Sequence, residues 1–389
     1  MTELIILRGM TWNHARGYAP MVETARQFTA LHPEIQIRWE QRSLKAFEDF
    51  PVEKLAADYD LIVLDHPWIP QVAPRGVLLP LDEHLPAAFL ADQAANSVGG
   101  SHASYAHAGH QWALAIDAAA PVAFWRDDLL KEHDAAVPRI WPELLDLARR
   151  GHVEIPAAPI NCLMNFYSFC DGAGESPFAT SERVVSRAIG LAALKRMQEL
   201  LALCDASVWS RNPIGSHELV ASATNSNLAY CPLAYGYSNY ARPRAGSHRL
   251  EFGEPPTLDD RPLRTTLGGT GLAVSALCPH TKAAVAYSAF VASPAIQRTS
   301  YTQSGGQPGH RAAWLDAGNN RITGDYFART LPVLDRALVR PRFAGYMQFQ
   351  SAGAEIFHAG LRGELPANDA LAQLDALYRE TLSATSIAP

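Results

Sequence analysis

Apolar residues along the first third of the chain follow two periods, one typical of strands and one typical of helices. Short runs with the length and composition of strands occupy residues 4–8, 35–39 and 61–64. Between the first two runs, apolar residues recur at helical spacing from Met21 to Leu31, and Pro20 favours a helix start there. A second helix is expected over residues 47–57. This order predicts a parallel sheet with right-handed crossovers.

The rest of the chain alternates further strands with longer helices. Strands are expected at residues 111–116, 121–125, 228–233 and 265–275. Helices are expected at residues 126–131, 142–150, 182–203, 283–293 and 294–301, and in the tail from residue 325. Neither an internal repeat nor a low-complexity linker interrupts this order. Two lobes joined by strands are therefore favoured over separate domains on a flexible linker.

Composition narrows the class of protein. The 389 residues are 48% hydrophobic and 19% charged, which suits about two globular domains with large cores. The net charge is −6 and no block of Lys and Arg occurs, so nucleic acid is not an expected partner. No apolar run reaches the length of a membrane span. Residues 1–8 lack the apolar core of a signal peptide, and five cysteines without a CxxC pattern favour reduced core thiols.

Polar and aromatic side chains follow two of the predicted strands at the point where each ends. Asp65, His66 and Trp68 follow the run at residues 61–64, and Trp12, Asn13 and His14 follow the first run. The carboxyl ends of parallel strands meet at one edge of a sheet, where α/β proteins bind ligands. An aromatic face beside amide, imidazole and carboxylate groups suits a small polar ligand. The alternatives are loop packing, a capping Asp65 and a core Trp68.

Further candidate ligand contacts lie at later strand ends and in glycine-rich loops: Asp117, Tyr167, Tyr235, Tyr237, Gly269, Thr270 and Arg311. Asp117 has a hinge cap as its alternative role, and Arg311 has a surface salt bridge. Residues 268–271 read Gly-Gly-Thr-Gly, which is not GxGxxG and opens no helix, so dinucleotide binding is excluded. Their glycines equally suit a close approach of two backbones.

Neither a metal site nor a catalytic motif stands out in the sequence. His102, His107 and His110 lack the spacing of metal ligands and favour a solvated loop. The sequence contains no GxSxG, P-loop or HExxH pattern. The adjacent Asp65 and His66 could serve acid–base chemistry, but no feature requires it. A binding protein without cofactor or metal is therefore favoured over an enzyme.

Four stretches spread along nearly the whole chain carry a family resemblance. They are residues 4–33, residues 59–71 with 79–82, residues 115–129 with 140–145, and residues 268–275 with 286–294 and 340–342. In this order they resemble a family 1 extracellular solute-binding protein, the carbohydrate-type receptor of ABC importers.

The resemblance implies an α/β, two-lobe periplasmic-binding-protein-like fold of type II, with the ligand cleft between hinged lobes. Lobe 1 would comprise residues 1–117 and 266–315, and lobe 2 residues 118–265 and 316–389. Such a protein is a periplasmic monomer that binds a sugar, polyol or related metabolite and presents it to an ABC permease. The alternative is a cytoplasmic enzyme or metabolite sensor that reuses the fold, because no signal peptide is visible and the cysteines are many.

Overall fold

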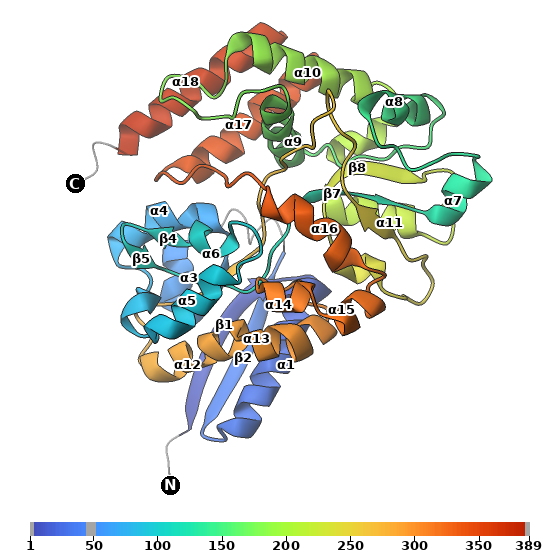
Figure 1. Cartoon of the computed structure of the whole chain (residues 1–389). Coiled ribbons are helices and arrows are strands. Elements are labelled where there is room, and N and C mark those ends of the chain that lie inside the picture. The colour runs from blue at the N-terminus through green and yellow to red at the C-terminus, as the bar shows by residue number, and fades with distance from the viewer. Residues whose placement is uncertain (1–3, 44–51, 386–389) are drawn as a thin grey trace. The chain divides into compact units, whose positions relative to one another are not determined.

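The computed structural model describes residues 4–43 and 52–385. The chain forms two compact units, the first from residues 1–119 and 267–331 and the second from residues 120–266 and 332–389 (Figure 1). The boundaries expected from the sequence differ from this division mainly at residues 316–331, which belong to the first unit. They do so because Trp314 packs against Tyr326 and Phe327, with ring centroids 6.2 Å and 5.1 Å apart.

The first unit is built on a five-stranded sheet in the order β2-β1-β3-β10-β6. Its strands are β1 (Ile5–Trp12), β2 (Ile35–Arg42), β3 (Leu61–Leu64), β6 (Leu114–Ala115) and β10 (Gly271–Val274). The first three strands are parallel, as predicted. β10 is antiparallel to both of its neighbours, because the chain re-enters the unit at the edge where β3 ends. β6 therefore runs in the same direction as β3.

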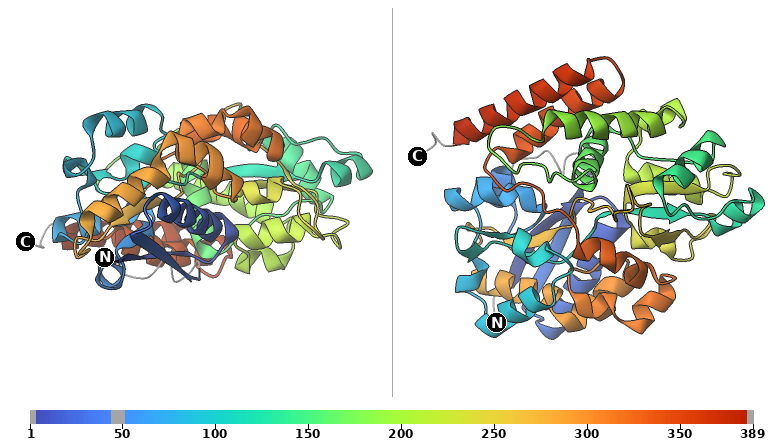
Figure 2. Two further views of the ribbon diagram at one scale, coloured as in Figure 1. Left: turned by 90° about the horizontal axis from the view of Figure 1, so that it is seen from below. Right: turned by 45° about the horizontal axis from the view of Figure 1, so that its top comes forward.

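Two long helices, α1 (Ala15–Leu31) and α12 (Thr281–Ala292), contact each other and the sheet (Figure 2). Phe28 of α1 packs edge-on against Tyr287 of α12, with centroids 5.3 Å apart. The Tyr287 hydroxyl also accepts a hydrogen bond from the Trp39 indole at 3.1 Å. The other α-helices in the described part of this unit are α3 (Val52–Asp58), α4 (Ile69–Val72), α5 (Ala87–Ala95), α6 (Ser101–Ser104), α13 (Pro294–Ile296), α14 (Arg311–Trp314) and α15 (Ala317–Ile322). α16 (Tyr326–Asp335) leads toward the second unit.

Several predictions for this unit were wrong in detail. Pro20 lies inside α1, which begins earlier because the His14 imidazole caps it by accepting the Arg16 amide at 3.1 Å. β1 continues to Trp12, because its residues 9–12 pair with residues 39–42. The predicted solvated loop contains a hairpin of β4 (Ala106–His107) and β5 (His110–Gln111). Of the helix predicted at residues 47–57, residues 47–51 lie outside the described residues, and α3 covers residues 52–57.

The second unit has a three-stranded antiparallel sheet in the order β8-β7-β9. The strands are β7 (Pro121–Trp125), β8 (Tyr230–Tyr235) and β9 (Glu251–Gly253). The helices are α7 (Asp127–Glu132), α8 (Trp141–Arg149), α9 (Pro159–Gly172), α10 (Arg187–Leu201), α11 (Pro213–Ala221), α17 (Tyr346–Leu361) and α18 (Ala367–Thr385). α9 is buried along almost its whole length and packs on α17 through Phe166 and Phe357, with centroids 4.3 Å apart.

The longest predicted helix of this unit begins later than expected. Residues 182–186 are not helical, because the Val184 amide donates to Asp375 Oδ1 of α18 at 2.9 Å. All five cysteines lie in the described part of the chain and are free thiols, and four of them are buried. None of the helices in the described ranges has the length and apolar character needed to cross a bilayer.

Candidate functional site

Four segments of the first unit meet at one edge of its sheet. β1, β3 and β6 all end there, and the antiparallel β10 begins there. The segments that follow or precede these strands are residues 12–16, 65–68, 115–119 and 268–271, which we call the strand-end edge. Ten of the thirteen predicted ligand contacts lie in the first unit, and nine of these belong to this edge. The edge is therefore the candidate site of this unit.

An ion pair that the sequence does not reveal lies within the strand-end edge. Arg16 Nε donates to Asp117 Oδ2 at 2.8 Å, and Arg16 Nη2 donates to Asp117 Oδ1. The side chains are 4% and 0% exposed. Burial raises the pKa of Asp117, and the guanidinium of Arg16 opposes that shift. No local pattern could predict this pair, because the two residues are 101 positions apart.

Two backbone segments run antiparallel beside Asp117. The Asp117 amide donates to the Thr270 carbonyl and the Thr270 amide donates to the Asp117 carbonyl, both at 3.0 Å. Gly269, which precedes Thr270, has a φ of +103°, and a Cβ at this position would stand 2.3 Å from the Asp117 carbonyl oxygen. Gln307 also binds the segment that contains Asp117, because its side-chain amide donates to the Ala118 carbonyl at 2.8 Å. The glycine-rich stretch thus permits a close approach of two backbones.

Asp65 caps the short turn that follows β3. Its Oδ1 accepts the His66 amide at 2.9 Å, and the side chain remains 19% exposed. His66 and Trp68 are buried. The His66 ring lies edge-on to Tyr105 with centroids 6.1 Å apart, and the Tyr105 hydroxyl donates to the Leu64 carbonyl at 3.3 Å. Of the three predicted contacts here, Asp65 has the accessible polar group.

The three predicted contacts after β1 differ in exposure. The Trp12 ring is buried against Gly17, where an added Cβ would stand 2.4 Å from the ring. Asn13 is exposed, and His14 is half-buried as the cap of α1. Asn13 is therefore the most exposed of these three residues.

Thr270 and Arg311 occupy different surroundings. Thr270 is buried, and its hydroxyl has no hydrogen-bond partner among the described residues. Arg311 begins α14, outside the strand-end edge, and its Nε donates to the Ser97 carbonyl at 3.3 Å. Its guanidinium is thus held by a backbone carbonyl.

The three remaining predicted contacts, Tyr167, Tyr235 and Tyr237, belong to the second unit. Tyr167 lies inside α9, edge-on to Phe178 with centroids 5.1 Å apart, and burial raises its pKa well above the usual value. Tyr235 ends β8, and its hydroxyl lies 2.9 Å from the Thr266 hydroxyl. Tyr237 is buried against the His217 ring at 5.7 Å.

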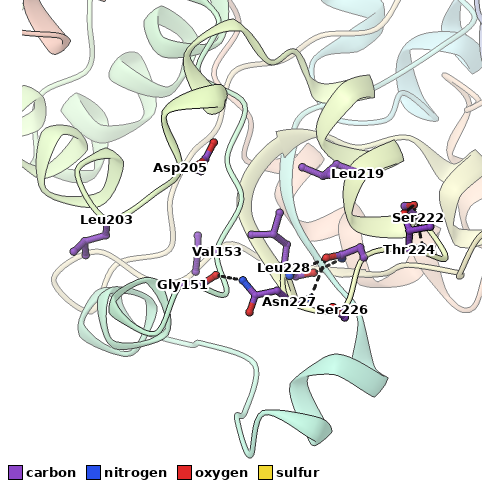
Figure 3. Close-up of a pocket in the computed structure, with 11 residues that line it drawn as sticks. Gly151, Val153, Leu203, Asp205, Leu219, Ser222, Thr224, Ser226, Asn227 and Leu228 are labelled. Carbon is purple, nitrogen blue, oxygen red and sulfur yellow. Dashed lines mark hydrogen bonds between the residues drawn. The ribbon is translucent and has the colours of Figure 1, made fainter.

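A pocket at the other end of β8 was not predicted. It has a volume of about 530 Å³ and lies in the second unit (Figure 3). Apolar Val153, Leu203 and Leu228 are among the residues that line it, and Asn225 shapes its rim by accepting the amides of Asn227 and Leu228. Its lining is Gly151, Val153, Leu203, Asp205, Leu219, Ser222, Thr224, Asn225, Ser226, Asn227 and Leu228. Its amide side chains are engaged with the protein itself.

Among the described residues, no group of three or more His, Cys, Asp or Glu side chains is placed to hold a metal ion. The strand-end edge combines amide, imidazole, carboxylate and aromatic groups, which can hydrogen-bond and stack on a polar organic molecule. The fold is that of an α/β protein of two units, and the strand-end edge is its candidate ligand site.

Residues 23–315 match the family of bacterial extracellular solute-binding proteins, and the chain belongs to that family. No curated protein sequence matches it significantly. Solved structures show the same fold. The maltose-bound MalE3 of T. maritima is 19% identical over 97% of this chain and 99% of its own, with a TM-score of 0.84.

Two further solved structures are similarly related. The GacH receptor of Streptomyces glaucescens, studied unliganded and with acarbose, is 18% identical, with a TM-score of 0.80 and coverage of 98% and 99%. An ABC transporter solute-binding protein of Agrobacterium radiobacter in complex with ribitol is 17% identical, with a TM-score of 0.81 and coverage of 97% and 99%. The two-lobe fold implied by the resemblance is confirmed by these matches.

Proposed function

We propose that this chain binds a sugar, polyol or related hydroxylated metabolite as the substrate-binding component of an ABC importer. The observation that carries the proposal is its membership of the bacterial extracellular solute-binding family over residues 23–315. Maltose, acarbose and ribitol are the ligands of three proteins with the same fold, which supports a solute of this kind.

Accessible polar groups give the proposal its chemistry. Asn13, His14 and Asp65 present an amide, an imidazole and a carboxylate at the strand-end edge of the first unit. Each can exchange hydrogen bonds with a hydroxyl group. Arg311, which is partly exposed, is a further side chain of the first unit that we assign to the solute.

The family also supports a location and a partner. We place the protein outside the cytoplasmic membrane as a monomer that delivers its solute to a membrane permease. Fractionation of the host tests the location, and light scattering on the purified chain tests the monomer. Recovery of the native protein from the cytoplasm would contradict the location, and a dimeric mass would contradict the monomer.

A thermal-shift screen tests the proposed solute class. The purified chain is heated with maltose, ribitol, D-mannitol or D-tagatose, and with amino acids at the same concentration as a control. A ligand at about 100 times its Kd stabilises a protein by about 2.7 kcal/mol, which raises the midpoint by several degrees. The proposal expects such a rise with at least one sugar or polyol. Equal midpoints with every sugar and polyol of the screen would contradict it.

Asp65→Asn probes the strand-end edge directly. Asparagine caps a turn about as well as aspartate, so the variant is expected to fold normally. Loss of the charged acceptor should weaken the solute's affinity about tenfold, measured by titration with the ligand found in the screen. Asp205→Asn is the matched control, because Asp205 also caps a turn, through the Ser207 amide at 2.8 Å, but lies in the second unit's pocket. Equal affinities of both variants would remove Asp65 from the site.

A further inference from the structure

Arg16 and Asp117 form a closed pair that leaves little for a ligand to bind. Both carboxylate oxygens of Asp117 accept from the guanidinium of Arg16, and neither side chain is more than 4% exposed. Asp117 was predicted from the sequence to contact the ligand. A carboxylate that is enclosed in this way is better placed to hold protein segments than to accept a hydroxyl group from a solute.

The pair joins segments that are far apart in the sequence. Arg16 lies in the first turn of α1, which follows β1 directly. Asp117 exchanges backbone hydrogen bonds with Thr270, and its neighbour Ala118 exchanges two with Gln307. One ion pair therefore connects the start of α1 with residues 115–119, 268–271 and 307. All but residue 307 belong to the strand-end edge.

A buried ion pair is a poor source of stability. Removing two charges from water costs about as much free energy as their attraction contributes. Apolar residues of similar size often stabilise the fold equally well. The bidentate geometry nevertheless fixes both the distance and the orientation of the two side chains. An ion pair of this kind can therefore fix the geometry of the strand-end edge, which an apolar pair cannot do.

We propose that Arg16 and Asp117 are positioning residues of the solute site, which hold the backbone of residues 117–119 and 268–270 in the arrangement that the solute meets. The effect on solute binding rests on the function proposed above, whereas the positioning of the backbone can be measured without any solute. The polar contacts between this edge and the solute are then made by the other side chains and by the backbone.

The test compares Arg16→Met, Asp117→Leu and the double variant in the full chain. Each single variant leaves one buried charge unpaired and should lower the unfolding midpoint strongly, whereas the double variant should recover most of it. Hydrogen–deuterium exchange then separates positioning from stability. In the double variant, amides of residues 116–119 and 267–271 should exchange about tenfold faster than in the wild type, while β2 and β8 stay unchanged. Wild-type exchange in these segments would overturn the proposal.

Arg16→Lys keeps the test decisive if the double variant does not fold. Lysine retains the charge but loses the planar fork, so faster exchange in the same segments is still expected. Unchanged exchange in the folded Arg16→Lys variant would equally overturn the proposal.

Binding of maltose and ribitol gives the functional readout. The double variant should bind the probe that the wild type binds at least about tenfold more weakly, at a temperature where both are folded. Equal affinity would overturn the positioning role. If the wild type binds neither probe nor any other sugar or polyol, the proposed function fails, and the exchange measurements still decide the role of Arg16 and Asp117.

Discussion

Gly269 illustrates how a single residue limits the backbone of the strand-end edge. Its φ of +103° lies in a region that other L-residues rarely adopt, and its Cα faces the Asp117 carbonyl. A side chain here meets both a conformational and a steric penalty. The local sequence Gly-Gly-Thr-Gly allows such a conformation, but only the fold shows which glycine needs it.

Replacement of Gly269 by alanine should therefore destabilise the first unit by about 2–4 kcal/mol, as strain and overlap add. Gly76→Ala is the matched control. Gly76 also has a positive φ, +62°, but among the described residues no atom beyond its chain neighbours lies within 4 Å of the place that an added Cβ would take, so a loss of about 1 kcal/mol is expected. Denaturant unfolding of both variants measures the difference. Equal losses would show that the contact with Asp117 carries no cost.

Asp82 gives the first unit a pH-dependent contribution to stability. Its carboxylate accepts the Gln111 amide at 2.8 Å and lies 2.9 Å from His110 Nδ1. Burial acts to raise its pKa, but these hydrogen bonds prevail and lower it below the ordinary 3.8. A lowered pKa means that the ionised group stabilises the folded state above pH 3.8, and that this contribution is lost as the pH falls through the folded value.

The wild type should accordingly be more stable than Asp82→Asn by about 1 kcal/mol at neutral pH. This advantage should shrink as the pH is lowered below 3.8, because the folded carboxylate then becomes protonated. Urea unfolding of the two proteins between neutral and acidic pH measures it. A difference that is constant with pH would contradict the assignment. Glu83→Gln, which removes an exposed carboxylate 3.9 Å from the same His110 nitrogen, serves as the control for the loss of a charge beside His110.

Helix packing in the second unit depends on small residues between α17 and α18, which run side by side (Figures 1 and 2). At Gly360 of α17, an added Cβ would stand 2.6 Å from the Ala370 Cβ of α18. At Gly353, the nearest atom is the flexible end of Leu374, 3.1 Å away. The first position leaves no room for a methyl group, whereas the second needs only a small shift.

Gly360→Ala should lower the stability of the second unit by about 1–3 kcal/mol, although alanine favours helices by about 1 kcal/mol over glycine. Gly353→Ala should change it by less than about 1 kcal/mol, because Leu374 can move. Adding Ala370→Gly to Gly360→Ala restores the space and should restore part of the loss. Thermal unfolding checks all three. A stabilised Gly360→Ala variant would contradict the close packing.

At the scale of elements, the sequence predicted the helices and strands whose pattern of apolar residues is regular. β3, β7 and α12 lie within about two residues of the expected positions, because local apolar patterns set them. Errors occur where distant contacts decide. β1 is extended by pairing with β2, and α10 begins late because the Val184 amide is bound by Asp375. α9 was not predicted, since a helix buried on nearly all sides has no polar face to reveal its period.

The candidate site was only partly predictable for the same reason. Strand ends such as Asp65 and Asp117 could be located, because parallel strands place their carboxyl ends at one edge. The partner of Asp117 could not be found, because Arg16 lies in a polar segment whose distance from Asp117 along the chain is 101 residues. Sequence therefore suggests which side chains gather at the edge, and the fold shows which of them are already engaged.

At the scale of the whole molecule, the chain passes between its two units three times, at residues 119, 266 and 331. Each unit therefore contains segments from distant parts of the sequence. The chain with this arrangement belongs to the bacterial extracellular solute-binding family. The central claim that follows is equilibrium binding of one hydroxylated solute molecule per chain.

Isothermal titration calorimetry of the wild-type chain with maltose, ribitol, D-mannitol and D-tagatose tests this claim most directly. We expect at least one of these to give a saturable heat with a stoichiometry of one and a Kd in the micromolar range or tighter. Folded protein that shows no saturable heat with these four, or with a wider set of sugars and polyols, would contradict the account.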